Sequence, residues 1–233
     1  MKNIITVLGI ILLLSSCGKD DTVNTMTVTG KIKGLKKGKL YLQHVPDTVL
    51  ISLDSLIIDG DGSFTFKTEL ESPEIFYLYL DKKDNNDIND RITFFGEPGT
   101  ININTNWNTF DTNVKITGSK SHIKYKEYRK IMSNVNKKSL EIMINALQTE
   151  DSLNQVSIDS VERLSVRNTQ RGYVHAINFA INNKDSYVAP YIALKEIPDA
   201  NPKYLDSILS ILTPEVAASK YGKALQKYLG EKQ

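Results

Sequence analysis

The fold is decided at Lys115–Tyr128, "KITGSKSHIKYKEY", where the hydrophobic period of the chain changes. Before Gly118, short runs rich in β-branched and aromatic residues are separated by turn residues. After Ser119, apolar residues recur at the spacing of a helix. Strands followed by helices, rather than alternating with them, predict an α+β chain with a β-rich domain at 26–118 and a helical subdomain at 119–233.

The β-rich half contains eight or nine candidate strands with regular turn signals, which predict an antiparallel β-sandwich or a partly open barrel. The run "EIFYLYL" (74–80) is apolar on both faces, as a central strand would be. Asp59-Gly60-Asp61-Gly62 predicts a hairpin turn. A calcium loop is the alternative, but it needs a glutamate where Thr68 stands. Pro98-Gly99 suits a type II turn.

The helical half contains two clear apolar stripes at i, i+3, i+4 and i+7, and we expect four to six helices. The stripes are Leu140, Met143, Ile144, Leu147 and Leu205, Ile208, Leu209, Leu212. Asn201-Pro202 and Thr213-Pro214 each place a capping residue before a first-turn proline, which predicts two helix starts. The last helix is expected at 214–229.

The N-terminus has the pattern of a secretory signal. The eleven-residue apolar run at 4–14 is too short to span a membrane, which takes ~20 residues. Leu14-Ser15-Ser16-Cys17 resembles the lipobox of bacterial lipoproteins, which implies a signal peptide at 1–16, lipidation of Cys17 and a lipidated tether at 17–25. A plain signal peptide with a chance cysteine is the alternative. Cys17 is the sole cysteine, so once it is lipidated the mature chain is expected to have no thiol left for catalysis, an internal disulfide or a cysteine metal site.

After Cys17, the tether continues with Gly18-Lys19-Asp20-Asp21. Lys19, Asp20 and Asp21 resemble the export signal of surface lipoproteins in Bacteroidetes-type bacteria, and a solvated linker is the alternative. We therefore expect an outer-membrane lipoprotein, on the periplasmic or the surface-exposed side. The formal charge of +2 is too small to indicate the basic surface that nucleic-acid binding requires.

No motif for catalysis or cofactor binding is present. His44, His122 and His175 lack metal-ligand spacing, and the sequence contains neither a G-x-S-x-G elbow nor a phosphate loop. We predict no catalytic residue, no metal site and no cofactor. Trp107, within the polar "NTNWNTF", is expected to be either a hydrophobic plug or a platform for a sugar or peptide.

Six Asp-Ser/Thr-aliphatic triplets resemble an O-glycosylation acceptor motif of exported Bacteroidetes proteins. The acceptors would be Thr22, Thr48, Ser55, Ser152, Ser160 and Ser207. Ordinary turn and helix-start chemistry, which also favours Asp followed by Ser, is the alternative.

Several phrases of the sequence resemble a known family. "VTGKIKGLKKGKLYL", "DSLIIDGDGSFTFK", "FFGEPGTININ" and "KITGSKSHIKYKEY" are similar to the β-rich N-terminal domain of unknown function of Bacteroidetes lipoproteins. "NNKDSYVAPYIAL" and "LTPEVAASKYGKALQKYL" resemble the helical segment that follows it. In many relatives a thioredoxin-like thiol–disulfide oxidoreductase domain comes next, but this sequence has no Cys-x-x-Cys. The resemblance therefore implies the accessory region alone, without catalytic residues.

Three functions are compatible with these patterns. The first is a membrane-anchored, non-catalytic binding or interaction module. The second is an accessory domain that docks a separate thioredoxin-like protein. The third is capture of a glycan or peptide at the cell surface, with Trp107 as the platform.

Overall fold

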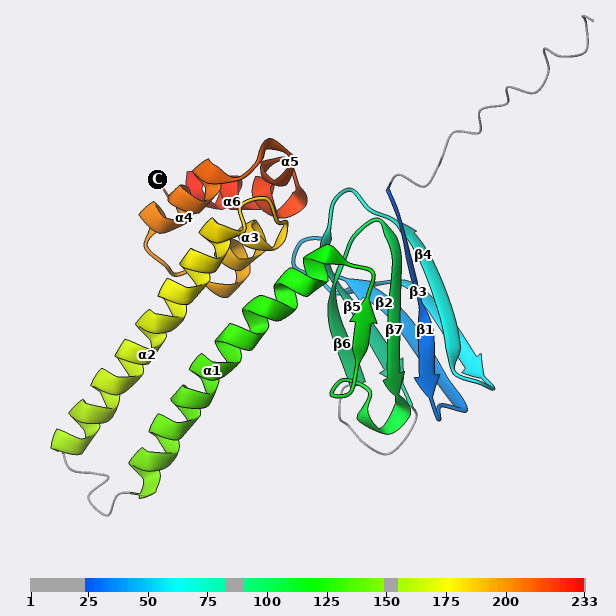
Figure 1. Cartoon of the computed structure of the whole chain (residues 1–233), viewed down its shortest axis with the longest axis horizontal. Helices are drawn as coiled ribbons and strands as arrows, with labels where there is room; N and C mark the ends of the chain where they lie inside the picture. The colour runs from blue at the N-terminus through cyan, green and yellow to red at the C-terminus, as the bar shows by residue number, and fades with distance from the viewer. Residues whose placement is uncertain (1–23, 83–89, 149–154, 233) are drawn as a thin grey trace, which may run out of the picture.

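The computed structural model describes residues 24–82, 90–148 and 155–232, and it confirms the α+β class. Eight strands come first and the helices follow (Figure 1). The strands are β1 (Thr25–Lys33), β2 (Lys37–His44), β3 (Ile51–Asp59), β4 (Ser63–Glu69), β5 (Glu74–Asp81), β6 (Asp90–Gly96), β7 (Gly99–Asn106) and β8 (Lys115–Thr117).

The strands form two sheets of four, which pack face to face as a sandwich. Sheet A has the order β4-β1-β7-β8, and sheet B has the order β3-β2-β5-β6. All pairs are antiparallel except β1 and β7, which run parallel, so sheet A is mixed rather than purely antiparallel as expected. The difference arises because the chain crosses from sheet B to sheet A between β6 and β7, and then runs in the direction of β1.

The predicted hairpin at Asp59–Gly62 is wrong. Strand β3 pairs with β2 in sheet B, whereas β4 pairs with β1 in sheet A, so this turn connects the two sheets. Gly62 has a φ of +78°, and a Cβ at this position would lie 2.2 Å from the Ile32 carbonyl oxygen. The Asp61 carboxylate accepts hydrogen bonds from Ser63, which together with Lys31 lower its pKa to about 2. The turn is thus held against the β1–β2 connection.

Strand β5 is the central strand that its sequence predicted. It pairs with β2 on one side and β6 on the other. Phe76, Leu78 and Leu80 point into the sandwich core, while Ile75 and Tyr77 face the helices. Because both faces of β5 carry apolar side chains, sheet B separates two hydrophobic cores.

The helices are α1 (Lys120–Gln148), α2 (Gln155–Asn182), α3 (Val188–Tyr191), α4 (Pro202–Ile211), α5 (Pro214–Ala217) and α6 (Lys220–Gly230), with a π-helical turn at Ile192–Glu196. Helix α1 begins as predicted after Gly118, where Ser119 Oγ accepts a hydrogen bond from the His122 N–H. The helix expected at 214–229 is divided into α5 and α6, because Ser219 caps a new helix by accepting from the Gly222 N–H.

The second core lies between sheet B and the helices. Ile75 and Phe95 of sheet B pack with buried tyrosines and aliphatic residues of α1, α3 and α6. The stripe predicted at 205–212 contributes, since Leu205 and Ile208 are fully buried. None of the described helices is long and apolar enough to cross a membrane.

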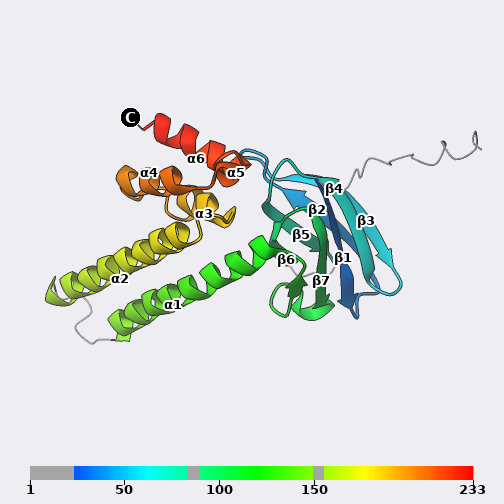
Figure 2. The same cartoon turned by 45° about the horizontal axis from the view of Figure 1, so that its top comes forward.

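Helices α1 and α2 form a long antiparallel hairpin that leads away from this core (Figures 1 and 2). Its seam is narrow and partly polar. Asn168 of α2 is 5% exposed, and its amide donates to the Val135 carbonyl (2.9 Å) and to Ser139 Oγ (2.8 Å) of α1. A buried asparagine of this kind fixes the register of two paired helices.

The apolar stripe at Leu140, Met143, Ile144 and Leu147 lies outside the seam. These side chains are 57%, 62%, 42% and 77% exposed, respectively, while the neighbouring Ile142 is buried. The prediction of a helix is confirmed, but the stripe contributes no core. The hairpin therefore exposes large apolar side chains near its far end.

Gly118→Ala should destabilise the protein much more than Gly99→Ala. Both glycines have positive φ, +94° and +111°, so both substitutions incur backbone strain of about 1 kcal/mol. Only at Gly118 would the Cβ meet backbone, 2.1 Å from the Thr100 carbonyl oxygen; nothing lies within 4 Å at Gly99. We expect Gly118→Ala to lower the free energy of unfolding in urea by at least ~2 kcal/mol more than its control. Equal losses would contradict this account.

Candidate functional site

The outer face of sheet B carries a row of tyrosine and cationic side chains that begins at the edge of the region that the helices cover and continues beyond it. Tyr41 of β2 stacks on Tyr79 of β5, with ring centroids 5.8 Å apart. Lys39 Nζ lies 4.8 Å from the Tyr41 ring centroid, and Arg91 Cζ lies 5.7 Å from that of Tyr79 and 5.6 Å from that of Tyr77. We call Lys39, Tyr41, Tyr77, Tyr79 and Arg91 the tyrosine–cation row.

Strand alternation and register produce this row. Leu40 and Leu42 of β2 point into the sandwich, so Lys39 and Tyr41 point outward. Tyr41, Tyr79 and Arg91 are direct cross-strand neighbours on β2, β5 and β6. Cation–π contacts and cross-strand aromatic pairs stabilise such a row.

Two buried polar atoms on this face have no hydrogen-bond partner among the described residues. They are Gln43 Oε1 and Arg91 Nε. Gln43 is 9% exposed, and its Nε2 donates to Ser52 Oγ at 3.1 Å, which leaves the amide oxygen as a free acceptor. Leaving a buried polar group without a partner costs free energy, so each of these atoms favours a bound water or ligand group.

A cavity of about 370 Å³ lies at one end of the row, between sheet B and the helices. Tyr77 belongs to both the row and the cavity wall. The other lining residues are Val45, Pro46, Asp47, Ile75, Tyr191, Leu194, Lys195, Lys220, Tyr221 and Ala224. Burial raises the pKa values of Tyr191 and Tyr221, so both phenols are neutral hydrogen-bonding groups.

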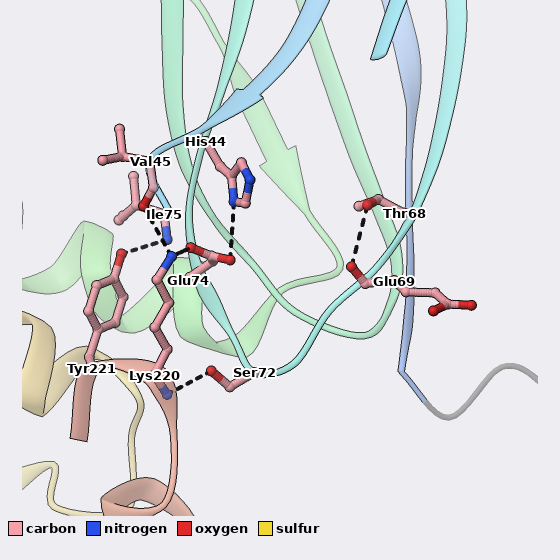
Figure 3. A network of polar contacts seen from close by, with 9 residues as sticks. All are labelled: His44, Val45, Thr68, Glu69, Ser72, Glu74, Ile75, Lys220 and Tyr221. Atoms are coloured by element: carbon pink, nitrogen blue, oxygen red, sulfur yellow. Dashed lines mark hydrogen bonds and ion pairs between the residues drawn. The ribbon is translucent and has the colours of Figure 1, made fainter. Parts of the chain in front are cut away.

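Polar contacts of α6 with β5 and with Val45, which follows β2, build one wall of this cavity (Figure 3). Lys220 Nζ forms an ion pair with Glu74, whose side chain is 9% exposed, and it donates to the Val45 carbonyl at 3.1 Å. His44 Nδ1 lies 3.3 Å from Glu74 Oε1. The Tyr221 hydroxyl accepts from the Ile75 N–H at 3.2 Å. These contacts fix the helical half on the sandwich.

A second cavity of about 310 Å³ lies at the other end of the row. Lys39 belongs to both the row and this cavity. The remaining lining residues are Lys37, Gly38, Ile57, Ile58, Asp59 and Lys82. The outer face of sheet B thus offers two cavities joined by the tyrosine–cation row.

Trp107 is not a plug of either hydrophobic core. It begins a short 3-10 turn, Trp107–Thr109, and is 44% exposed. Its ring lies against Gly34, where a Cβ would be 2.6 Å from the indole Cδ1, and Lys82 Nζ lies 5.6 Å from the ring centroid. A further cavity of about 260 Å³ beside it is lined by Gly34, Leu35, Lys36, Lys37, Lys82 and Trp107.

The other predicted site residues are scattered. Cys17, Lys19, Asp20, Asp21, Thr22 and Ser152 lie outside the described residues. Thr48 lies in an exposed bend between β2 and β3, and Ser55 is exposed on β3. Ser160 accepts from Arg163 on α2, and Ser207 donates to the Lys203 carbonyl on α4. The structure brings none of these residues to the tyrosine–cation row.

The histidines do not converge. His44 contacts Glu74, His175 is exposed on α2, and His122 is buried at the start of α1. Within 24–82, 90–148 and 155–232, no group of three His, Cys, Asp or Glu side chains is arranged to hold a metal ion.

Residues 26–125 match the family model of a domain of unknown function, DUF4369. The match covers the eight strands and the first turn of α1, in agreement with the resemblance of the β-rich half to a domain of unknown function. Neither a curated protein nor a solved structure is significantly similar to the chain.

Sequence reasoning missed the tyrosine–cation row, although part of its signal was visible. In "KLYLQ" and "YLYLD", tyrosine alternates with leucine. The tyrosines therefore lie on the face of the sheet opposite to the one that carries the leucines of the core. Arg91 and Gln43 lie on the same surface only because β2, β5 and β6 pair, and no local pattern predicts that pairing.

Breaking the Glu74–Lys220 ion pair should destabilise the junction between the sandwich and the helices. Lys220→Met leaves a buried carboxylate without its cation, and we expect a loss of about 3 kcal/mol in chemical unfolding. Adding Glu74→Gln should recover about 1 kcal/mol or more, because the unpaired charge is then removed. Additive losses in this double-mutant cycle would contradict a coupled pair.

His122 should make stability fall as the solution is acidified. Burial, with a contribution from Lys126, lowers its pKa from 6.5 to about 4. Between these values the unfolded chain binds the proton and the folded chain does not, so stability decreases as pH falls, by about 3 kcal/mol in all. We expect His122→Asn to reduce the slope of the unfolding free energy against pH between pH 6.5 and 4. The exposed control His175→Asn should keep the slope of the wild type. The same slope in both variants would refute this assignment.

Proposed function

We propose that the protein is a membrane-anchored, non-catalytic interaction module that recruits a partner protein through its α1–α2 hairpin. The observation that carries this proposal is the exposed apolar stripe Leu140, Met143, Ile144 and Leu147 on a hairpin that leads away from both cores. Large apolar side chains gathered on an exposed surface are typical of interaction sites. Asn168 fixes the hairpin register, so the stripe is presented on a preformed surface.

The charge of α1 indicates the chemistry of the partner. This helix carries seven Lys and Arg residues against two Glu. Lys137 and Lys138 lie in the turn that precedes the stripe, and Lys138 is paired with Glu141. A second copy of this surface would oppose like charges, whereas a protein with acidic residues around an apolar patch would be complementary. We therefore propose an acidic protein partner, of which a separate thioredoxin-like protein would be one instance.

Anchoring through a lipidated Cys17 to the outer membrane, on its periplasmic or surface-exposed side, is part of the proposal. It is supported by the lipobox-like Leu14-Ser15-Ser16-Cys17 and by Lys19, Asp20 and Asp21.

Capture of a glycan or peptide is a second candidate function, and the exposed, lysine-flanked ring of Trp107 favours it.

The recruitment proposal is tested by purifying the native lipidated protein from its own membranes and identifying bound proteins by mass spectrometry. We expect a stoichiometric acidic partner. The triple variant Leu140→Ser/Met143→Ser/Leu147→Ser should reduce its recovery at least tenfold, because buried apolar contacts of about 1–2 kcal/mol each are lost.

The matched control is Val49→Ser/Tyr204→Ser, which also removes exposed apolar side chains but lies outside the hairpin. Both proteins should unfold like the wild type. Equal recovery of the partner with both variants would exclude the stripe as the docking surface. Reproducible catalysis by purified protein would refute a non-catalytic role.

Cys17→Ser should release the protein from the membrane fraction. Stable anchoring requires the acyl chains that would be attached to the Cys17 thiol and to the amino group that cleavage before Cys17 exposes. The measurement is fractionation with mass spectrometry of the N-terminal peptide. Persistence of the variant in the membrane fraction would contradict a lipid anchor at this residue.

A further inference from the structure

We infer that the outer face of sheet B is a second binding site, which takes an extended peptide segment carrying acidic side chains beside a large apolar one. The site comprises the tyrosine–cation row, Gln43 and the cavity between sheet B and α6. It lies on different elements from the apolar stripe of α1, so the two surfaces can be tested separately.

Arg91 provides the anion recognition. Its guanidinium is held against the rings of Tyr77 and Tyr79, and no carboxylate of the described residues lies within ion-pair distance of it. Its Nε is a buried donor without a partner in the same part of the chain. A guanidinium offers a fork of donors that matches a carboxylate in two-pronged geometry. The aromatic contacts hold this fork in place before any ligand arrives.

Gln43 provides an acceptor on the same face. Because its Nε2 is engaged by Ser52, the buried Oε1 is an acceptor that lacks a donor, and the backbone N–H of an extended peptide would supply one once the side chain turns outward. Gln43 is the cross-strand neighbour of Tyr77, so this acceptor lies beside a tyrosine that contacts Arg91. A peptide supplies both a carboxylate side chain and a backbone donor.

The cavity beside Tyr77 fits a large apolar side chain. Its walls include Ile75, Leu194, Pro46 and the rings of Tyr191 and Tyr221. Its charged lining residues are Lys195, Lys220 and Asp47, while the opposite cavity has Lys37, Lys39 and Lys82 against Asp59. Lys220 and Lys82 are already paired with Glu74 and Asp90, which leaves Lys195 against Asp47 in the first cavity and Lys37 and Lys39 against Asp59 in the second. Together with Arg91, the remaining cations outnumber the carboxylates along the row, so acidic side chains are favoured beside the apolar one.

The arrangement of the rings favours a peptide over an acidic sugar. Tyr41 and Tyr79 stack on each other, and their outer sides are approached by Lys39 and Arg91. Each of these two rings already has an aromatic and a cationic neighbour, which leaves less open ring face on which a sugar could stack. Tyrosine and arginine are also the residue types enriched at the centres of protein interfaces.

The test uses the full chain purified in detergent and a library of capped pentapeptides with Glu at alternate positions and varied residues between. We expect binding by members with Phe, Tyr or Leu at the central position, measured by fluorescence polarisation. Replacing Glu by Gln, or the central residue by Ala, should weaken binding at least tenfold, since a charge-assisted hydrogen bond or a buried side chain is lost. Trigalacturonate is the acidic-sugar comparison.

Arg91→Gln should weaken binding of the selected peptide at least tenfold, and Arg91→Lys should restore only part of it. The control Arg171→Gln removes the same charge from an exposed position on α2 and should change the Kd less than twofold. The triple variant of the α1 stripe should bind the peptide normally, which separates this site from hairpin recruitment.

The inference is overturned if no library member binds, or if Arg91→Gln and Arg171→Gln have equal effects with both proteins folded. Tighter binding of trigalacturonate than of any peptide, lost in Arg91→Gln, would reassign the surface to acidic sugars.

Discussion

Sheet B must bury apolar side chains on both of its faces, and the rest of the structure depends on this constraint. Strand β5 is apolar on either side, with Phe76 and Leu78 in one core and Ile75 in the other. A sandwich alone would cover only one of these faces. The helices therefore cover apolar residues on the outer face of sheet B. The Glu74–Lys220 ion pair and the Tyr221–Ile75 hydrogen bond hold them there.

The covering of sheet B is incomplete, and this creates its candidate site. Helices α1, α3 and α6 pack over Ile75 and Phe95, but not over Tyr41 and Tyr79. The uncovered part carries tyrosines and cations instead of aliphatic residues, as a partly hydrated surface requires. The cavity at Tyr77 marks the boundary between these two regions.

The α1–α2 hairpin packs against the second core at one end only. Near the sandwich, Tyr125 and Tyr128 of α1 join the second core. Farther along, the two helices have only each other, and Asn168 and Gly172 of α2 contact Val135 and Met132 of α1. Leu140, Met143, Ile144 and Leu147 find no surface to cover among the described elements, although the spacing that predicted their helix is intact.

Local patterns in the sequence determined the α+β class, the start of α1 after Gly118, the central position of β5 and the helix starts at Pro202 and Pro214. Each depends on the period of apolar residues, on a capping residue or on the fixed φ of proline, and these act within a few residues. Pairing between distant strands was decided only by the tertiary structure. Asp59–Gly62 joins two sheets rather than two paired strands, and β1 runs parallel to β7, because strand partners are chosen by how both sheets bury their faces. Likewise, only that pairing brings Arg91, Tyr79, Tyr41 and Gln43 to one surface, since they come from three strands whose register no local pattern specifies.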